Sequence, residues 1–211
     1  MNILVIENPD MMCEIVFELK SQIEGYEGRF MLSENQSEMK IDSLATIVID
    51  PFAVDLNQKD LLSKLYAKMK MDALSEDEYL LTNELLAEIM RNIQRLMNRQ
   101  PVILDSAEAD LSTLFRYMGI SFAKSESLLE TLQDYVDVCS EYRGIRLFIF
   151  VNLKSYLSDQ DVFELYRHLI YTKKNVLLIE HTESKYIEGE VVRVIDSDLC
   201  EVTVFSKKYI H

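Results

Sequence analysis

The apolar residues of this chain change their spacing twice, and this change constrains the fold more than any other feature. Short apolar runs rich in β-branched residues occur near both ends, as at residues 2–6 and 175–179. From residue 58 to residue 142, apolar residues instead recur every three or four positions. The first spacing is typical of buried strands and the second of amphipathic helices. The chain is therefore predicted to carry strands toward its ends and helices in its middle.

Strands and helices alternate outside the middle segment. Buried-type strands are predicted at residues 2–6, 43–49, 146–151 and 175–179, with a terminal hairpin at 191–195 and 201–205. Helical spacing at residues 11–23 and 158–170 lies between them. Strands connected through helices favour a mainly parallel α/β sheet, whose ligands bind beyond the carboxyl ends of the strands. Polar residues end three of these strands, at Asp50, Asn152 and Glu180.

The middle segment has the apolar pattern of about four helices. One apolar stripe consists of Leu81, Leu85, Ile89, Ile93 and Leu96. Because the segment interrupts the strand pattern, it is predicted to be an insertion rather than a tail. We therefore expect residues 1–58 and 144–211 to form an α/β head domain and residues 59–143 to form an inserted all-helical domain.

The composition is that of a globular chain. Of its 211 residues, 48% are hydrophobic and 27% are charged, which excludes a mostly disordered chain. Cys13, Cys139 and Cys200 are widely separated and form no paired motif, which favours a reduced intracellular protein. No apolar run reaches the roughly 18 residues of a membrane span, and the N-terminus lacks the features of a signal peptide. We therefore expect a cytoplasmic protein with no membrane partner.

Short motifs for nucleotide, metal or nucleophile chemistry are missing from the sequence. A phosphate-binding loop needs G-x-x-x-x-G-K-[ST], yet none of the five glycines precedes a lysine. The dinucleotide motif G-x-G-x-x-G, the zinc motif H-E-x-x-H and the elbow G-x-S-x-G are missing as well. We therefore expect no nucleotide cofactor and no catalytic residue.

Asp50 leaves a second interpretation open, that of a phosphoacceptor receiver domain. The runs ILVIEN near the start and IVIDP at residues 47–51 resemble the strands of such a domain. A receiver places acids after its first strand, where Glu7 stands here, and a phosphorylated aspartate after its third. Two features oppose this interpretation. Asn8 and Pro9 stand where a second acid is expected, and a helical segment follows Asp50 where a fourth strand is required.

Basic residues form local stripes on the helical segment despite a net charge of −14. The stripes consist of Arg91, Arg95 and Arg99, which recur every four residues, and of Lys64 and Lys68, with Lys59 close before them. The acidic charge opposes nucleic-acid binding over the whole surface, so phosphate contacts are expected at such stripes. No aromatic residues interleave with them, which favours the backbone of a duplex over stacking on single strands. Lys154, which follows a strand end, is a further candidate contact to DNA.

The order of the elements and several sequence phrases resemble one known family. The phrases are NILVIEN at the start, IVIDPFAVDLN at residues 47–57 and LFIFVNLKSYLSDQDVFELYRHLIYTKKNVLLIEHTE at residues 147–183. The helical phrases LLAEIMRNIQ (85–94) and LFRYMGIS (114–121) fit in the same register. Over nearly its full length, the chain resembles the subtype II-A CRISPR adaptation proteins, the Csn-two family.

This resemblance implies both a fold and a function. Members have an α/β head with a degenerate P-loop-ATPase-like core, no working nucleotide motif, and an inserted helical leg. Four chains close into a homotetrameric ring that threads double-stranded DNA ends through a basic central hole. They act in spacer acquisition, a step of antiviral defence, with the CRISPR integrase pair and the large effector nuclease. The resemblance thus implies a non-enzymatic, sequence-independent DNA-binding protein. An inactive ATPase-like scaffold that binds only proteins is the third interpretation, beside the receiver domain.

The resemblance also implies a calcium site in an acid-rich stretch after the long leg helix. Here that stretch is RQPVILDSAEAD at residues 99–110, and its first part supplies no carboxylate. Asp105, Glu108 and Asp110 remain as candidate ligands. Calcium takes about six to eight oxygen ligands, so three acids would supply only part of a site.

Overall fold

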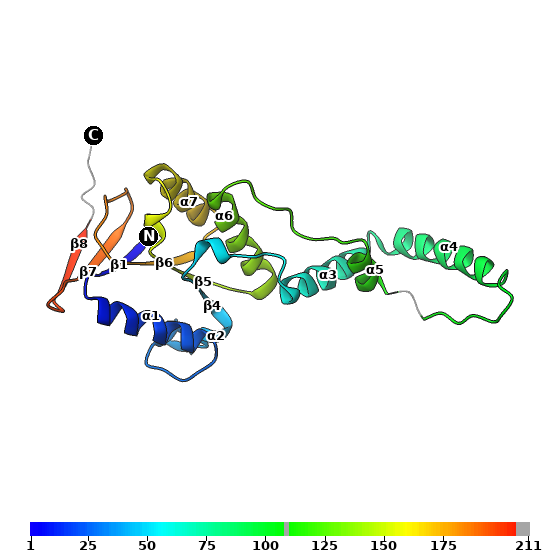
Figure 1. Ribbon diagram of the computed structural model, residues 1–211, viewed down its shortest axis with the longest axis horizontal. Coiled ribbons are helices and arrows are strands. Elements are labelled where there is room, and N and C mark those ends of the chain that lie inside the picture. The colour runs from blue at the N-terminus through cyan, green and yellow to red at the C-terminus, as the bar shows by residue number, and fades with distance from the viewer. Residues whose placement is uncertain (108–109, 206–211) are drawn as a thin grey trace. The chain divides into compact units, whose positions relative to one another are not determined.

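The computed structural model describes residues 1–107 and 110–205 (Figure 1). The chain divides into two compact units. The first, the sheet unit, comprises residues 1–55 and the residues from 124 onward. The second, the helical unit, comprises Leu56–Ala123.

The sheet unit is built on a six-stranded sheet. Its strands lie in the order β4 (Ala45–Val48), β5 (Leu147–Val151), β6 (Asn175–Glu180), β1 (Asn2–Ile6), β7 (Val191–Ile195) and β8 (Glu201–Phe205). Neighbours pair in parallel except β7 and β8, which run antiparallel. The predictions of a mainly parallel α/β sheet and a terminal hairpin are therefore confirmed.

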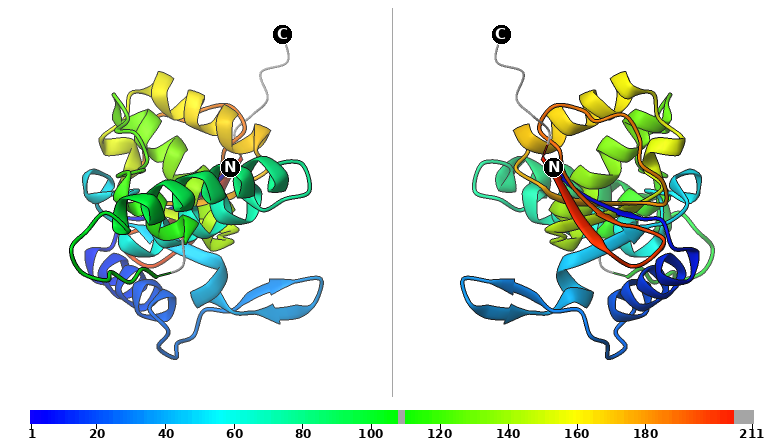
Figure 2. Two further views of the ribbon diagram at one scale, coloured as in Figure 1. Left: turned by 90° about the vertical axis from the view of Figure 1, so that its right-hand side faces the viewer. Right: turned by 90° about the vertical axis from the view of Figure 1, so that its left-hand side faces the viewer.

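Helices cover both faces of this sheet, with α1 (Pro9–Ile23) on one face and α6 (Leu128–Val138) and α7 (Asp159–Tyr171) on the other (Figures 1 and 2). Met12, Ile15 and Leu19 of α1 pack against a cluster made of Ile6, Ile149, Val151 and Ile179. On the opposite face, the ring of Tyr135 in α6 meets the buried ring of Phe148 edge to face. A parallel sheet is buried on both sides, which explains why its strands are continuous apolar runs.

Local sequence signals fix where these helices begin. The Asn8 side chain accepts a hydrogen bond from the Met11 amide at 3.0 Å, and Pro9 follows as the first residue of α1. At the start of α7, Ser158 and Asp161 form a capping box, in which each side chain accepts the backbone amide of the other. These caps satisfy amide groups that the first helical turn leaves without partners.

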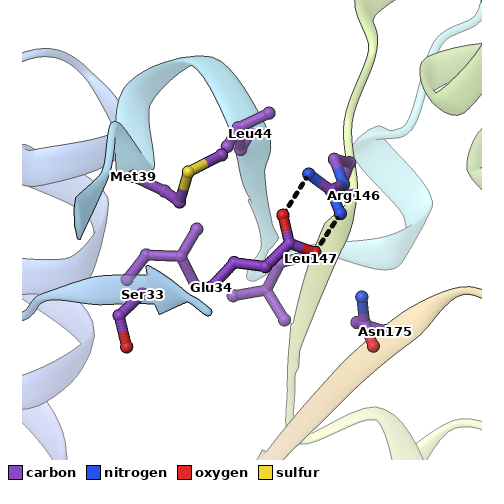
Figure 3. Close-up of a pocket in the computed structure, with 8 residues that line it drawn as sticks. Ser33, Glu34, Met39, Leu44, Arg146, Leu147 and Asn175 are labelled. Carbon is purple, nitrogen blue, oxygen red and sulfur yellow. Dashed lines mark hydrogen bonds and ion pairs between the residues drawn. The ribbon is translucent and has the colours of Figure 1, made fainter. Parts of the chain in front are cut away.

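A small hairpin and a short helix connect α1 to β4. The hairpin consists of β2 (Leu32–Glu34) and β3 (Ser37–Met39), and α2 (Ile41–Leu44) follows it. Asn35 and Gln36 both have positive φ, as a two-residue hairpin turn of this kind requires. The Arg146 guanidinium donates to both carboxylate oxygens of Glu34, at 2.9 and 2.5 Å (Figure 3). This ion pair ties the hairpin to the start of β5 and borders a hollow of about 290 Å³.

The helical unit contains α3 (Lys59–Ala73), α4 (Tyr79–Met97) and α5 (Leu111–Tyr117). Helix α3 packs on α5, and Leu61 is fully buried. The Tyr66 hydroxyl of α3 donates to the Ile120 carbonyl at 2.7 Å. Asn57 exchanges two hydrogen bonds with the Phe122 backbone, at 3.2 and 2.9 Å. These bonds join the two ends of the unit to each other.

The boundary of the helical unit differs from the expected range 59–143. The fourth expected helix, α6, belongs to the sheet unit, because its residues Leu132 and Val136 are fully buried there. The chain then passes through a π-helical turn at Cys139–Arg143 and turns at Gly144, whose φ is 73°. Periodicity identified α6 as a helix but gave no information about which unit it covers.

Truncation of a core ring is expected to destabilise the sheet unit strongly. Phe148→Ala removes a side chain with no exposed surface, and such cavities cost about 3–5 kcal/mol. Phe17→Ala is the matched control, because Phe17 is 72% exposed. Urea denaturation would measure both variants. Equal decreases in unfolding free energy would contradict the placement of Phe148 in the core.

Candidate functional site

The carboxyl edge of the parallel strands is the usual ligand-binding edge of an α/β sheet. Asn152 follows β5 with φ of 53°, a left-handed conformation that asparagine tolerates. The side-chain oxygen of Asn152 accepts a hydrogen bond from the His181 backbone amide at 2.9 Å. The backbone amide of Asn152 donates to the Ile179 carbonyl at 2.8 Å. His181 Nδ1 lies 3.1 Å from the Ile6 carbonyl and must carry the hydrogen, since a carbonyl only accepts. The ends of β5, β6 and β1 are thus bonded to one another.

Glu180 ends β6 as a buried carboxylate, with 4% of its surface exposed. One of its oxygens accepts the backbone amide of Lys154 at 3.1 Å. Burial raises the pKa of the Glu180 carboxyl, and the hydrogen bond from Lys154 only partly opposes this shift. The Glu180 carboxylate is therefore used inside the protein, where it accepts the Lys154 backbone amide at the carboxyl edge of the sheet.

Lys154 is held in a buried ion pair with Glu190. Its Nζ lies 2.6 Å from Oε1 of Glu190, and the two side chains are 8% and 0% exposed. The Tyr166 hydroxyl donates to the same oxygen at 2.8 Å, and the Ile187 amide donates to the other oxygen at 3.0 Å. Burial and the charge of Glu190 raise the pKa of Tyr166 well above its usual range. The buried carboxylate of Glu190 neutralises Lys154, which argues against the interpretation of Lys154 as a phosphate contact.

The connection between β1 and α1 is where a phosphate-binding loop would begin. Only Glu7 and Asn8 separate the strand from the helix. The Asn8 side chain caps α1, and the Glu7 amide donates to the Ile195 carbonyl at 2.9 Å. This two-residue turn has no glycine and forms no wide loop, so its geometry differs from that of a phosphate cradle.

The strand order also bears on the receiver interpretation of Asp50. Asp50 follows β4 at the edge of the sheet, and its side chain accepts the Phe52 amide at 2.9 Å. Glu7 follows β1, which β5 and β6 separate from β4. Because the two acids end strands that are not neighbours, they do not form the shared acidic site that a receiver needs. The receiver interpretation is therefore excluded by the topology.

The remaining expected DNA contacts lie on the helical unit and are exposed. Lys59, Lys64 and Lys68 belong to α3, Arg91 and Arg95 to α4, and Arg99 follows α4. Arg95 donates to the Asn92 side chain at 2.7 Å. Exposed cations on helices are suitable for contacts to a phosphate backbone. The sequence prediction that these six residues bind DNA stays a prediction.

The three expected calcium ligands do not form a described cluster. Asp110 caps α5 through the Thr113 amide at 2.9 Å and pairs with Lys70 at 2.7 Å. These partners hold the pKa of the Asp110 carboxyl well below its usual range, with the Lys70 bond contributing most. Asp105 accepts the adjacent Ser106 amide, and Glu108 lies outside the described residues. Within residues 1–107 and 110–205, no three His, Cys, Asp or Glu side chains are placed to hold a metal ion.

Two features that bear on the candidate site were missed by sequence reasoning. The first is the buried cluster of Lys154, Glu190 and Tyr166, whose members come from three separate segments. The second is α4, in which no residue is buried, although its apolar spacing indicated a packed helix. Spacing defines an apolar face but does not show what covers it.

Among the described helices, none is long and apolar enough to cross a membrane.

Removal of Lys154 is expected to destabilise the sheet unit. Lys154→Ala leaves the Glu190 carboxylate buried without its cation, which costs about 3–5 kcal/mol. The double variant Lys154→Met, Glu190→Gln should recover much of that stability, because the glutamine oxygen still accepts hydrogen bonds. Lys185→Ala, which breaks the exposed pair with Asp159, is the control and should change little. Denaturant titrations that rank Lys185→Ala as the more damaging change would contradict this assignment.

Glu180 is expected to make stability depend on pH. Because its pKa is raised in the folded protein, ionisation of Glu180 costs the folded state more than the unfolded state. Wild type should therefore lose stability relative to Glu180→Gln as pH rises above the ordinary value of 4.5 and through the raised pKa. Denaturation of both proteins across a pH series measures this difference. A difference that shrinks as pH rises would mean that the amide donors outweigh burial.

Comparison with known proteins identifies a family. The model of a family described as CRISPR-associated protein (Cas_Csn2) matches residues 22–199. The matched residues include all of the helical unit and the strands β2 to β7. No curated protein sequence matches the chain.

Proposed function

Because the chain belongs to the Cas_Csn2 family of CRISPR-associated proteins, which implies a role in CRISPR adaptation, we propose that it serves there as a non-enzymatic DNA-binding protein. The proposed ligand is the end of a DNA duplex. Lys and Arg side chains contact its phosphates, which fix a protein on DNA without reading the sequence. The CRISPR integrase pair and the large effector nuclease are the proposed protein partners.

The contrast between two sets of basic side chains supports this proposal. At the sheet edge, Lys154 is neutralised by a buried carboxylate. On the helical unit, Lys59 and Lys64 are exposed to solvent, and no acidic partner is described for either. Binding to a duplex gains free energy when such exposed cations release the counterions of the phosphates. The helical unit is therefore the proposed DNA-binding part.

A homotetrameric ring is the proposed form of the protein. A single chain with a net charge of −14 is repelled by DNA over most of its surface. A ring that gathers basic side chains from four copies around one hole would oppose this repulsion where the duplex passes. The proposed DNA binding requires no nucleotide.

Calcium stays a proposed ligand near Asp105 only, because the carboxylate of Asp110 is already paired with Lys70.

Threading through a ring predicts a preference for DNA with ends. Linear and covalently closed circular duplexes of one sequence would be compared across a salt series, with the mass in solution measured in parallel. We expect a tetramer that binds only the linear form, with affinity that falls steeply as salt rises. Equal binding to both forms would contradict threading. A folded oligomer that binds neither form would contradict DNA binding and support the protein scaffold instead.

Removal of the exposed lysines of α3 is expected to reduce the salt dependence of binding. Lys59→Ala and Lys64→Ala each take away one cation, and the slope of log affinity against log salt should fall by about 0.9 for every phosphate that is no longer neutralised. The control removes the same charge from the sheet unit, with Lys20→Ala and Lys40→Ala, and should leave the slope unchanged. A larger effect of the control pair would move the interface to the sheet unit.

A further inference from the structure

Two aromatic rings stand close together at the carboxyl edge of the sheet. Phe52 lies in the 3-10 turn η1 (Pro51–Ala53) that follows β4, and Tyr156 follows the 3-10 turn η3 (Leu153–Ser155) after β5. Because β4 and β5 are neighbours in the sheet, their carboxyl ends bring the two rings together. The ring centroids are 5.3 Å apart and the ring planes meet at 85°. This edge-to-face contact is a favourable geometry for an aromatic pair.

Both rings keep much of their surface in solvent. Phe52 is 68% exposed and Tyr156 is 50% exposed, and Ile49, directly after β4, is exposed beside them in the sequence. The aromatic pair therefore does not fill the core of the sheet unit. Large aromatic side chains are enriched where proteins meet a partner, because each ring offers a wide contact area at a low cost in side-chain entropy.

A carboxylate stands next to this aromatic pair. The Asp50 side chain accepts the Phe52 backbone amide at 2.9 Å, which fixes the carboxylate at the start of the turn that carries Phe52. Asp50 is exposed, and within the described part of the chain no ion pair of Asp50 is found. A carboxylate beside exposed ring faces is suited to an organic cation. The carboxylate accepts its hydrogen bonds, and the ring attracts its charge through the ring quadrupole.

The charge of the surrounding edge selects a basic partner. Within the sheet unit, the segments that follow the five parallel strands are residues 7–8, 49–55, 152–158, 181–190 and 196–200. They contain eight acidic residues and two lysines. Both lysines are already paired within the chain, Lys154 with Glu190 and Lys185 with Asp159. The excess negative charge attracts a cationic surface and repels phosphate, which argues against use of the rings to stack nucleic-acid bases.

Arginine suits this site better than lysine does. Its guanidinium group is planar, stacks on aromatic faces, and can donate two parallel hydrogen bonds to a carboxylate. It is also more weakly hydrated than an ammonium group, so it loses less hydration when it lies on a ring. The ammonium group of lysine is a compact, strongly hydrated charge and lacks the flat surface that a ring face matches.

We propose that Asp50, Phe52 and Tyr156 form a docking site for an arginine side chain on a basic segment of a partner protein. The guanidinium group lies on an exposed ring face and donates to the Asp50 carboxylate. The acidic edge around the site attracts the other cations of the same segment. All three residues belong to the sheet unit, so this site is separate from the DNA contacts proposed for the helical unit.

Two labelled peptides of equal charge test the preference for arginine. Hexaarginine and hexalysine with blocked ends would be titrated with the full chain at one salt concentration, and fluorescence anisotropy would report binding. We expect wild type to bind hexaarginine more tightly than hexalysine, because only the guanidinium group combines stacking with the paired hydrogen bonds. Equal affinity for the two peptides would overturn the proposal.

Truncation of each ring locates the binding of the arginine peptide. Phe52→Ala and Tyr156→Ala should each weaken hexaarginine binding by about twofold to fivefold, as loss of an exposed cation–π contact does. Phe17→Ala is the matched control, because Phe17 is an equally exposed ring on α1. Circular dichroism confirms that all three variants fold. Losses in the ring variants no larger than that of Phe17→Ala would overturn the site.

The charge of Asp50 has a control of its own. Asp50→Asn removes the charge, while the asparagine oxygen still accepts the Phe52 amide and keeps the turn capped. Glu38→Gln removes one exposed charge from the hairpin β2–β3 instead. Asp50→Asn should weaken hexaarginine binding by up to about fivefold, and Glu38→Gln should weaken it less. Equal losses would mean that the peptide responds only to the total charge of the protein, which would overturn the site.

Nucleic-acid probes separate this site from the proposed function. A labelled oligothymidylate that loses affinity for Tyr156→Ala, while hexaarginine binding stays unchanged, would overturn the arginine site and assign the rings to base stacking. Linear duplex DNA should bind wild type and the two ring variants alike. Wild type that binds hexaarginine but no duplex would contradict the proposed function alone. Duplex binding by a protein whose ring variants leave hexaarginine binding unchanged would contradict the arginine site alone.

Discussion

The parallel sheet must be covered on both of its faces, and the remainder of the sheet unit is arranged around this requirement. Phe148 and Phe150 of β5 point to the face of α6 and α7, while Ile149 and Val151 point to the face of α1. A shift of one residue in the register of β5 would exchange these two sets of side chains between the two helical layers, and each set would lose the layer it packs against. In the sequence, the helical unit is inserted after β4, which is an edge strand of the sheet.

The same compact sheet leaves polar groups at its carboxyl edge, where many α/β proteins bind a ligand. In this protein the groups bind one another. Lys154 pairs with Glu190, Glu180 accepts the Lys154 amide, and Asn152 holds the start of the segment that follows β6. A buried charge must be paired, and here the partner is a residue of the same chain. This internal pairing leaves Lys154 without a free charge at the sheet edge.

In the helical unit, by contrast, many apolar and charged side chains are exposed, and much of this surface has no described partner within the chain. Self-association and DNA binding would draw on neighbouring side chains of that unit. Lys59 and Lys64 of α3 and Arg91 and Arg95 of α4 are all exposed.

The sequence by itself determined the main strands and helices of this protein, although not the hairpin β2–β3 or the short helix α2. Apolar runs located the strands of the sheet, and helical spacing located α1 and α7 to within about two residues, because these signals act over a few neighbouring positions. The segments that carry the family resemblance were visible as well. Only the tertiary structure decided that α6 covers the sheet, that Lys154 is buried against Glu190, and that the apolar row of α4 is exposed. Each of these depends on which segments meet in space. Periodicity reports that a residue needs a partner but does not identify the partner.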